Sequence, residues 1–474
     1  MRNLLRSRRG SAAFATVIAL VPLIGAVALG AEAGSWYVTW QHARNAADSA
    51  AYSGALRLAC TIAGATCEAQ SVDYRAKQFA AQSAFCNSGD TAYPGTNCTG
   101  SLPTGISHAV QIDIGDYNAG AFTTPAAGIG NAVRARVSQQ QPAYLAAVLG
   151  LTTVNIPAQA IAQVQQPSKL CGLSLGPDPN GGGGALKLGG NVSNNGTGCP
   201  LMSDASVQFA STPAFTGSGW AVLGATGCSP AGTCASATVT HNYFMPPAMD
   251  PLQRLKTETF NTASFSTPQG AGNPCGGSGN ANISNGQSCT INQNTLTTAY
   301  SGRLSVAAGG TVNFQSIAGG GTYYFSGNVT IAGTATLQAG TYFFKDSAIT
   351  FSGTVTGTNV TLVLLGNSSL KINGGGVNLS APTTNTFSSD LNGVLIDDQA
   401  TGAVTINGNG TVQLGGAMYF PNTDVSFGGS VQPANTTCSE VIAKTLNMTG
   451  GAYLSTDGCV PSTIAYSQVV ALVQ

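Results

Sequence analysis

Charge is the scarcest property of this sequence. Only 8% of its 474 residues are Asp, Glu, Lys or Arg, against about 25% in an ordinary soluble domain. The 18 basic and 18 acidic residues balance, so we expect no basic surface for nucleic acid. The apolar share of 43% excludes a disordered chain. The 62 glycines follow no three-residue period, which excludes collagen.

Histidine and close cysteine pairs are also scarce, so little is available for a metal site. The histidines are His42, His108 and His241, and no C-x-x-C motif occurs. We therefore expect neither zinc nor another cofactor. The 12 cysteines instead predict disulfides in an oxidising compartment. Pairing sequence neighbours keeps every loop short, although spacing alone leaves the connectivity open. In that order the pairs are Cys60 with Cys67, Cys86 with Cys98, Cys171 with Cys199, Cys228 with Cys234, Cys275 with Cys289 and Cys438 with Cys459.

One apolar run near the start is long enough to cross a membrane. Four arginines precede it within residues 1–9, and no charged residue occurs from Gly10 to Ala31. As a helix this run would measure about 33 Å at ~1.5 Å per residue, enough for a hydrocarbon core of ~30 Å. Pro22 would kink the helix, which membrane helices tolerate. We predict a transmembrane helix over residues 10–34, with the basic segment 1–9 in the cytoplasm.

Aromatic residues follow this run where the helix would leave the lipid. Trp36, Tyr37 and Trp40 are typical of the outer membrane–water interface, which puts the rest of the chain outside the cytoplasm. A cleaved secretory signal is the alternative, because Ala31-Glu32-Ala33 has the small-x-small form of a cleavage site. The apolar run exceeds the usual length of a signal core, which favours retention in the membrane.

Residues 35–168 predict a small α+β region outside the membrane. A helix continues to about residue 63, and alternating apolar residues predict strands near 110–114, 132–137 and 154–164. Pro142 begins a short apolar helix that ends at Gly150. Small side chains over residues 41–56 suit contact with a partner helix, although an Ala-rich helix has them for propensity alone.

Residues 169–474 change to short apolar runs between Gly and Asn turns. Gly321-Thr-Tyr-Tyr-Phe325 recurs as Gly340-Thr-Tyr-Phe-Phe344, and Val360–Leu365 follows about one period later. Such a repeat of 19 to 20 residues is typical of a right-handed parallel β-helix-like domain. A β-sandwich is the alternative, with strand spacing of about 8–12 residues. A Pro-rich insertion near 241–275 interrupts the repeat.

Three stretches resemble the TadG-like proteins of bacterial Flp (Tad) pilus assembly. The first runs from Arg8-Arg9-Gly10 through Pro22 to Glu32. The second is Gln41-x3-Asn45-Ala-Ala-Asp48-Ser-Ala-Ala-x2-Gly54-Ala, and the third is Pro142 to Gly150 with the run 154–164. Ala248-Met-Asp-Pro-Leu252 and the later coils resemble the C-terminal region of one subgroup.

The resemblance implies a membrane protein with pilus-assembly or pseudopilin proteins as partners. It also implies a partner contact at an acidic residue beside the outer end of the span. Glu32 fills that place, and Asp48 is a second candidate. Asp204-Ala-Ser206-Val-Gln208 lacks the second Ser of a metal-binding Asp-x-Ser-x-Ser motif, so metal-dependent adhesion is not expected. Ala15 stands where a prepilin cleavage site has Glu, so that processing is not expected either.

Catalysis by the repeat region is the competing hypothesis. Parallel β-helices host polysaccharide lyases and hydrolases, and glycoside hydrolysis needs converging carboxylates. Asp397-Asp398 and Asn422-Thr-Asp424 resemble polygalacturonase motifs superficially, but in the reverse order, and no histidine lies beyond 241. We therefore predict no catalytic residue and no enzyme.

The sequence as a whole favours a non-enzymatic structural or interaction protein of pilus assembly, anchored in the bacterial cytoplasmic membrane. Its β-helical domain would serve adhesion or anchor the pilus, with a carbohydrate or another surface ligand left open. The alternatives are a secreted β-helix enzyme acting on polysaccharides, and a cleaved and exported surface adhesin.

Overall fold

The computed structural model describes residues 8–474 apart from 64–67, 88–101, 124, 126–128, 167, 177–184, 195–197, 237–238, 261–274, 276–278, 292–298 and 316–319. The chain forms two compact units. The first consists of Met1–Gln165 with Val470–Gln474, and the second of Gln166–Val469. The predicted fold class is confirmed, because a long apolar helix, a small β unit and a parallel β-solenoid of about 10 turns follow one another.

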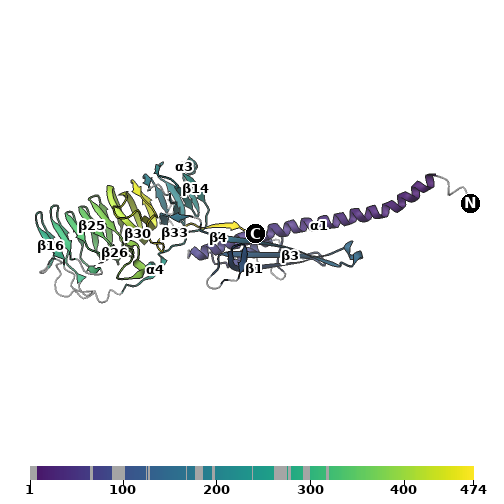
Figure 1. Ribbon diagram of the computed structural model, residues 1–474, viewed down its shortest axis with the longest axis horizontal. Coiled ribbons are helices and arrows are strands. Elements are labelled where there is room, and N and C mark those ends of the chain that lie inside the picture. Colours follow the sequence, from purple (N-terminus) through teal and green to yellow (C-terminus); the bar gives the residue numbers. More distant parts are fainter. Residues whose placement is uncertain are drawn as a thin grey trace, which may run out of the picture. The chain divides into compact units, whose positions relative to one another are not determined.

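The first unit combines two helices with a five-stranded sheet. α1 (Arg8–Ala63) is one continuous helix (Figure 1). α2 (Val72–Gln82) follows it. The strand order is β2-β1-β3-β4-β34, and β3 is antiparallel to both β1 and β4. A single 3-10 turn, η1 (Ala146–Leu149), joins β3 to β4 in place of the longer predicted helix. The strands are β1 (Ser107–Asn118), β2 (Ala121–Thr123), β3 (Ala132–Pro142), β4 (Thr153–Gln165) and β34 (Val469–Leu472).

Small side chains allow the second half of α1 to pack closely on the sheet. Its alanines from Ala43 to Ala59 are buried against β3, β4 and α2. At Gly54 an added Cβ would lie 3.0 Å from Val133 Cγ1 and 3.1 Å from Ala76 Cβ. The small residues that suggested a partner helix are therefore covered within the chain.

The second unit is a solenoid whose coils pair through parallel strands. Its elements up to residue 243 are β5 (Lys169–Leu170), β6 (Gly172–Ser174), β7 (Leu186–Leu188), β8 (Val192–Ser193), β9 (Leu201–Ser203), β10 (Ser206–Phe209), β11 (Phe215–Thr216), β12 (Ala221–Gly224), β13 (Gly227–Ser229), α3 (Ala231–Ser236) and β14 (Thr240–Tyr243). The elements of the connecting segment and the long array are α4 (Gln253–Thr257), β15 (Ala281–Ile283), β16 (Ser288–Ile291), β17 (Ala299–Tyr300), β18 (Leu304–Val306), β19 (Thr311–Phe314), β20 (Gly321–Phe325), β21 (Val329–Ile331), β22 (Thr334–Leu337), β23 (Gly340–Lys345), β24 (Ala348–Phe351), β25 (Thr354–Thr358), β26 (Val360–Leu365), β27 (Ser369–Asn373), β28 (Val377–Ser380), η3 (Ser389–Leu391), β29 (Val394–Asp398), β30 (Val404–Val431), β31 (Ser439–Met448), β32 (Ala452–Tyr453) and β33 (Ala465–Tyr466).

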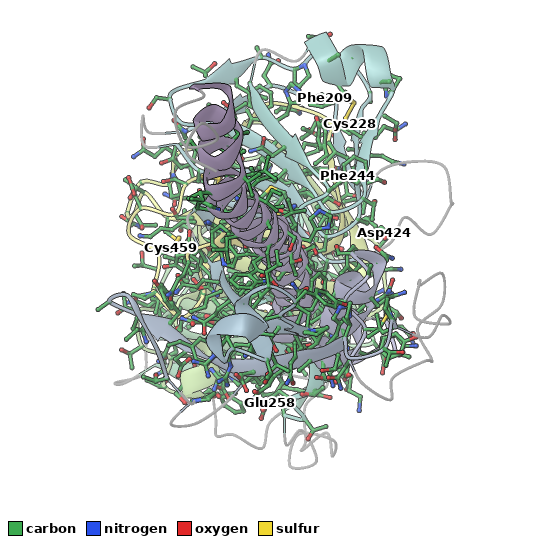
Figure 2. The ribbon with its side chains drawn as sticks, turned by 90° about the vertical axis from the view of Figure 1, so that its right-hand side faces the viewer. Phe209, Cys228, Phe244, Glu258, Asp424 and Cys459 are labelled. Atoms are coloured by element: carbon green, nitrogen blue, oxygen red, sulfur yellow. A yellow bond between two sulfur atoms is a disulfide. The ribbon has the colours of Figure 1, made fainter. Side chains whose placement is uncertain are left out.

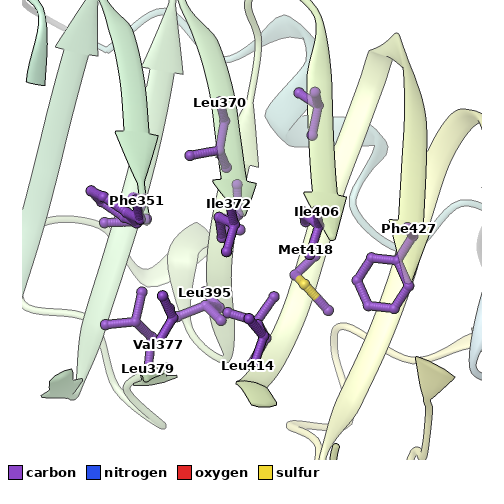
Figure 3. Close-up of a cluster of buried hydrophobic side chains, with 14 of the residues drawn as sticks. Phe351, Leu370, Ile372, Val377, Leu379, Leu395, Ile406, Leu414, Met418 and Phe427 are labelled. Carbon is purple, nitrogen blue, oxygen red and sulfur yellow. The ribbon is translucent and has the colours of Figure 1, made fainter. Parts of the chain in front are cut away.

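The sequence repeat sets the register between coils. β20 and β23 pair with Gly321 opposite Gly340 and Tyr323 opposite Tyr342, the 19-residue shift of the repeat. The rings of Tyr323 and Tyr342 stack with centroids 4.5 Å apart. Inward Leu, Ile, Val and Phe side chains form the core of the later coils (Figure 3). Because each coil covers the apolar side of the next, the stack is stable only as a series.

The coils are stacked in a permuted order. The long array runs from β15 to β31, and β31 then pairs in parallel with β6 and β7, the first coil of the unit. From there the stack continues through β9 and β12 to β14. In Figure 1 the colour along the stack therefore passes from yellow at β30 to teal at β14. The solenoid is ordered as if residues 281–448 preceded residues 172–243.

This order requires residues 244–280 to connect opposite ends of the stack. Part of the connection, residues 245–260, is called the strap here. It packs Ala248, Leu252, Leu255 and Phe260 on a second apolar layer, outside the solenoid, with Met202, Tyr419, Val363 and Phe343 among its members. The rings of Phe260 and Phe343 are 5.6 Å apart. The Pro-rich insertion predicted from the sequence thus contains a packed connection.

Four disulfides lie in the second unit. They join Cys171 to Cys199, Cys228 to Cys234, Cys275 to Cys289 and Cys438 to Cys459. Cys228 lies in β13 and Phe209 ends β10, both in the coils of residues 172–243 (Figure 2). Cys60 and Cys86 are also disulfide-bonded. Cys67 and Cys98 lie outside the described residues, so their pairings stay predictions.

The Gly321–Gly340 register gives a stability prediction. Gly340 has a φ of +155°, and an added Cβ would meet the Gly321 backbone oxygen of the neighbouring coil at 2.2 Å. We expect Gly340→Ala to lower the free energy of unfolding by roughly 2–4 kcal/mol, because backbone in two coils must shift. Denaturant unfolding measures this. Gly451→Ala is the control, since nothing lies within 4 Å of its added Cβ. Equal stability of the two variants would contradict the register.

Candidate membrane anchor and partner surface

The first half of α1 presents an apolar surface that no described residue covers. Its candidate membrane span begins at Ala15, has a mean hydropathy of 2.0 over its most apolar window and is 0% buried there. Seven large side chains between Val17 and Leu29 are 45% to 67% exposed. Leaving so many large apolar groups in water is unfavourable, and a lipid environment removes that cost. The helix predicted from the sequence is therefore present and long enough to cross a membrane.

The predicted interface aromatics lie on α1 just beyond this apolar surface. Tyr37 is 61% exposed, whereas Trp36 and Trp40 are half-buried. The Tyr37 and Trp40 ring centroids are 5.9 Å apart. Gln41 donates a hydrogen bond to the Tyr37 hydroxyl at 2.8 Å, and the Arg44 guanidinium lies 5.7 Å from the Trp40 ring. Polar partners on the side away from the span suit aromatics at a lipid–water boundary.

Glu32 binds a loop of its own chain. Its carboxylate accepts backbone N–H bonds from Tyr144 at 2.6 Å, from Leu145 at 3.1 and 3.2 Å and from Ala146 at 2.9 Å. Ala146 is the first residue of η1, where N–H groups have no partner within the turn. Glu32 thus fixes the β3–β4 connection at the end of the apolar surface. Its predicted contact with another subunit is not tested by this bond and stays a hypothesis.

Asp48, the second predicted partner contact, has no partner within the described part of the chain. It lies on the α1 half that packs on the sheet, and it is half-buried. Its neighbours Ala46, Ala47 and Ala50 are fully buried. A half-buried carboxylate without a hydrogen bond or ion pair is free to receive one from another molecule.

The carboxylates of the catalytic hypothesis do not form an open site. Asp397 and Asp398 are 0% exposed. Asp398 accepts bonds from the Ala400 N–H at 3.0 Å and the Thr423 hydroxyl at 3.2 Å. Asp424 is on the surface (Figure 2), where it accepts a bond from the Thr445 hydroxyl at 2.8 Å. A polysaccharide cannot reach the two buried groups without movement of the chain.

Two half-buried acids, Asp204 and Asp250, fasten the strap instead. Asp204 accepts the Ala248 N–H at 2.6 Å, and Tyr419 donates to Asp250 at 2.8 Å. Burial raises the pKa of Asp204 to about 8, and the nearby Asp250 adds to this shift. Asp204, the nearest match to a metal-binding motif, therefore holds the strap. Among the described residues, no three His, Cys, Asp or Glu side chains gather as metal ligands.

Glu440 is a further buried acid, placed where the two segments of the solenoid join. It lies in β31 opposite Ala417 and is 1% exposed. Neither carboxylate oxygen has a hydrogen-bond partner among the described residues, and the nearby Thr463 hydroxyl donates to the Val460 carbonyl at 3.0 Å. Burial raises the pKa of Glu440 to about 8 and that of Asp398 to about 7.

Glu440 and α2 were not predicted from the sequence, and Asp250 was noted only within the motif Ala248-Met-Asp-Pro-Leu252, without a role. α2 carried a usable signal, because Ser71 caps its N-terminus, Asp73 lies in its first turn and Lys77 pairs with Asp73 at 3.0 Å. The two acids stand among ordinary loop and strand residues. Only the packing of the strap and of β31 distinguishes them from exposed acids.

The raised pKa values predict that the solenoid is less stable at alkaline pH. Unfolded carboxyls titrate near pH ~4, so the folded state holds protons that the unfolded state has lost. The stabilisation is complete below about pH 4 and is lost as pH rises through about 7 to 8. We expect the melting temperature to fall between about pH 5 and pH 9.

Glu440→Gln should make the melting temperature fall less with pH, because the amide carries no proton to lose. At alkaline pH we expect the loss of unfolding free energy to be smaller by on the order of 3 kcal/mol. Asp424→Asn, an exposed neighbour on β30, is the matched control. Thermal unfolding across the pH range measures both variants, and an unchanged pH profile for Glu440→Gln would count against the buried acid.

The Glu32 bonds predict protection of three amides. Glu32→Gln removes the charge that accepts them, and hydrogen bonds to charged groups contribute about 1.5–3 kcal/mol. We expect amide hydrogen exchange at Tyr144, Leu145 and Ala146 to become at least about tenfold faster. Asp48→Asn, which removes a carboxylate without a partner, should leave these amides unchanged. Equal exchange in wild type and Glu32→Gln would show that the bonds do not hold the loop.

Comparison with known protein families finds its matches in the first unit. Residues 10–57 match the family described as "Putative Flp pilus-assembly TadE/G-like", and residues 53–162 match "Putative Tad-like Flp pilus-assembly". Neither a curated protein nor a solved structure matches the chain. The two matched regions contain the apolar helix, the Glu32 loop and strands β1, β3 and most of β4. These matches confirm the resemblance seen in the sequence, because residues 10–162 are similar to putative Flp pilus-assembly families of the TadE/G-like kind.

Proposed function

We propose that this chain is a non-enzymatic structural protein of Flp pilus assembly, anchored in the bacterial cytoplasmic membrane by α1. Its N-terminus faces the cytoplasm, and the sheet unit and solenoid lie on the outer side. The observation that carries the proposal is the uncovered apolar surface between Val17 and Leu29. The orientation is supported by the four arginines before residue 10.

The half-buried carboxylate of Asp48 supports a contact with another pilus-assembly protein or pseudopilin. It lies outside the span, on the half of α1 whose alanines pack on the sheet. A basic or N–H group of a partner would complete its bonding. The solenoid would then form a rigid body for adhesion or for holding the pilus. The burial of Asp397 and Asp398 favours this role over action on polysaccharides.

Three substitutions to lysine on the same helix test the proposal. Val27→Lys places a charge in the span at a cost of about 2.5–3.5 kcal/mol, so the chain should be lost from the membrane and Flp pili should decrease. Asp48→Lys should keep the chain in the membrane but reduce co-purification of pilus-assembly proteins from detergent-solubilised membranes. His42→Lys, at an exposed site between the two, is the control.

Membrane retention of Val27→Lys with normal pili would overturn the anchor. Normal co-purification with Asp48→Lys would overturn the partner contact alone. A wild-type chain found in the medium with Gly34 as its first residue would instead identify a cleaved and exported adhesin.

A further inference from the structure

We infer that the loop between β3 and β4, residues 143–152, rests on the lipid surface as a second membrane contact beside α1. This inference depends on the proposed membrane anchoring. The loop is called the hairpin loop below, and the partner it fits is the boundary between lipid headgroups and acyl chains. It would hold the sheet unit at a fixed height above the membrane.

The bonds of Glu32 place the hairpin loop at the end of the span. Glu32 directly follows Ala31, the last residue of the charge-free run. Its carboxylate lies 2.6 to 3.2 Å from the backbone nitrogens of Tyr144, Leu145 and Ala146. A loop bonded to the residue where the apolar run ends lies at the depth where α1 leaves the acyl chains.

The side chains of the hairpin loop suit that depth. Tyr144 is 77% exposed, Leu151 46% and Leu145 40%. No charged residue occurs from Val137 to Ser168, between Arg136 and Lys169. β3 and β4 carry these uncharged residues on both sides of the loop. Apolar side chains with a tyrosine, and no charge nearby, are what an interfacial segment requires.

Continuity with the span favours lipid over a protein partner. The exposed apolar residues of the hairpin loop and those of α1 meet at Glu32, so whatever solvent surrounds the end of the span also surrounds the loop. Trp36, Tyr37 and Trp40 follow Glu32 within eight positions on the same helix. Interfacial residues on α1 and in the loop would thus lie at the same boundary.

Depth measurements on the full chain in vesicles of phosphatidylethanolamine and phosphatidylglycerol test the inference. A spin label is attached to Tyr144→Cys or Leu151→Cys, and its collisions with oxygen, which concentrates in lipid, are compared with those of a water-soluble nickel chelate. Gln159→Cys is the matched control, because it is exposed on β4 but farther along the strand. Val27→Cys reports on the span, and labelling of the unsubstituted protein gives the background.

We expect the oxygen-to-nickel ratio at 144 and 151 to exceed that at 159 severalfold, with the highest ratio at 27. If 144 and 151 match 159 while 27 is in lipid, the hairpin loop is in water and the inference fails, although the anchor stands. If 27 is also in water, the proposed anchoring fails and the inference with it. Shielding of 144 from both reagents would identify a protein contact and overturn the inference.

Discussion

The parallel ladder between β31 and β6 is the contact on which the solenoid depends. A coil of a parallel β-helix leaves one row of backbone N–H and C=O groups and one apolar side unpaired at each end. By pairing with β6 and β7, β31 removes two such ends at once and joins a short array to a long one. This pairing requires a long connection in the chain. Because the first coil of the sequence occupies the middle of the stack, the chain must cross from one end to the other, and the strap forms that connection.

The strap explains an arrangement of polar groups that would be puzzling in an ordinary solenoid. One face is apolar on both sides, since inward residues such as Tyr342 fill the core and outward residues such as Phe343 lie under the strap. Acids on that covered side lose their water. Asp204 and Asp250 have bonds to the strap or the solenoid wall, and burial raises the pKa of both. Burial also raises the pKa of Glu440, which lies in β31. Desolvation in a packed structure is a sufficient cause of these raised pKa values, which therefore do not require a catalytic site.

The family matches lie in the first of the two units. The matched part places an apolar helix, an acid at its end and a sheet in one continuous arrangement, and Glu32 connects the helix to the sheet. Hydrogen bonds from backbone N–H groups to the Glu32 carboxylate make this connection. The alanine face of α1 is not part of it, because that face packs on the sheet of the same unit. The alanines serve close packing inside the unit. Asp48 is the carboxylate of that helix half, and it has no bond among the residues that the structure describes.

Several elements could be read from the sequence because each depends on a short-range pattern. The charge-free run gave α1, the alternation around Val110, Val133 and Ile156 gave β1, β3 and β4, and the 19-residue repeat gave the register of β20 on β23. The continuous apolar run Val360–Leu365 also carried a sign of burial on both faces, which the repeat alone did not use. The contacts of Glu32, the path of the strap and the burial of the acids depend on the tertiary structure. Glu32 meets Tyr144 across 112 residues and Asp250 meets Tyr419 across 169. A periodic pattern in a short stretch of sequence cannot predict contacts between residues so far apart. Such contacts depend on the order in which the coils stack and on the path of the chain that connects them.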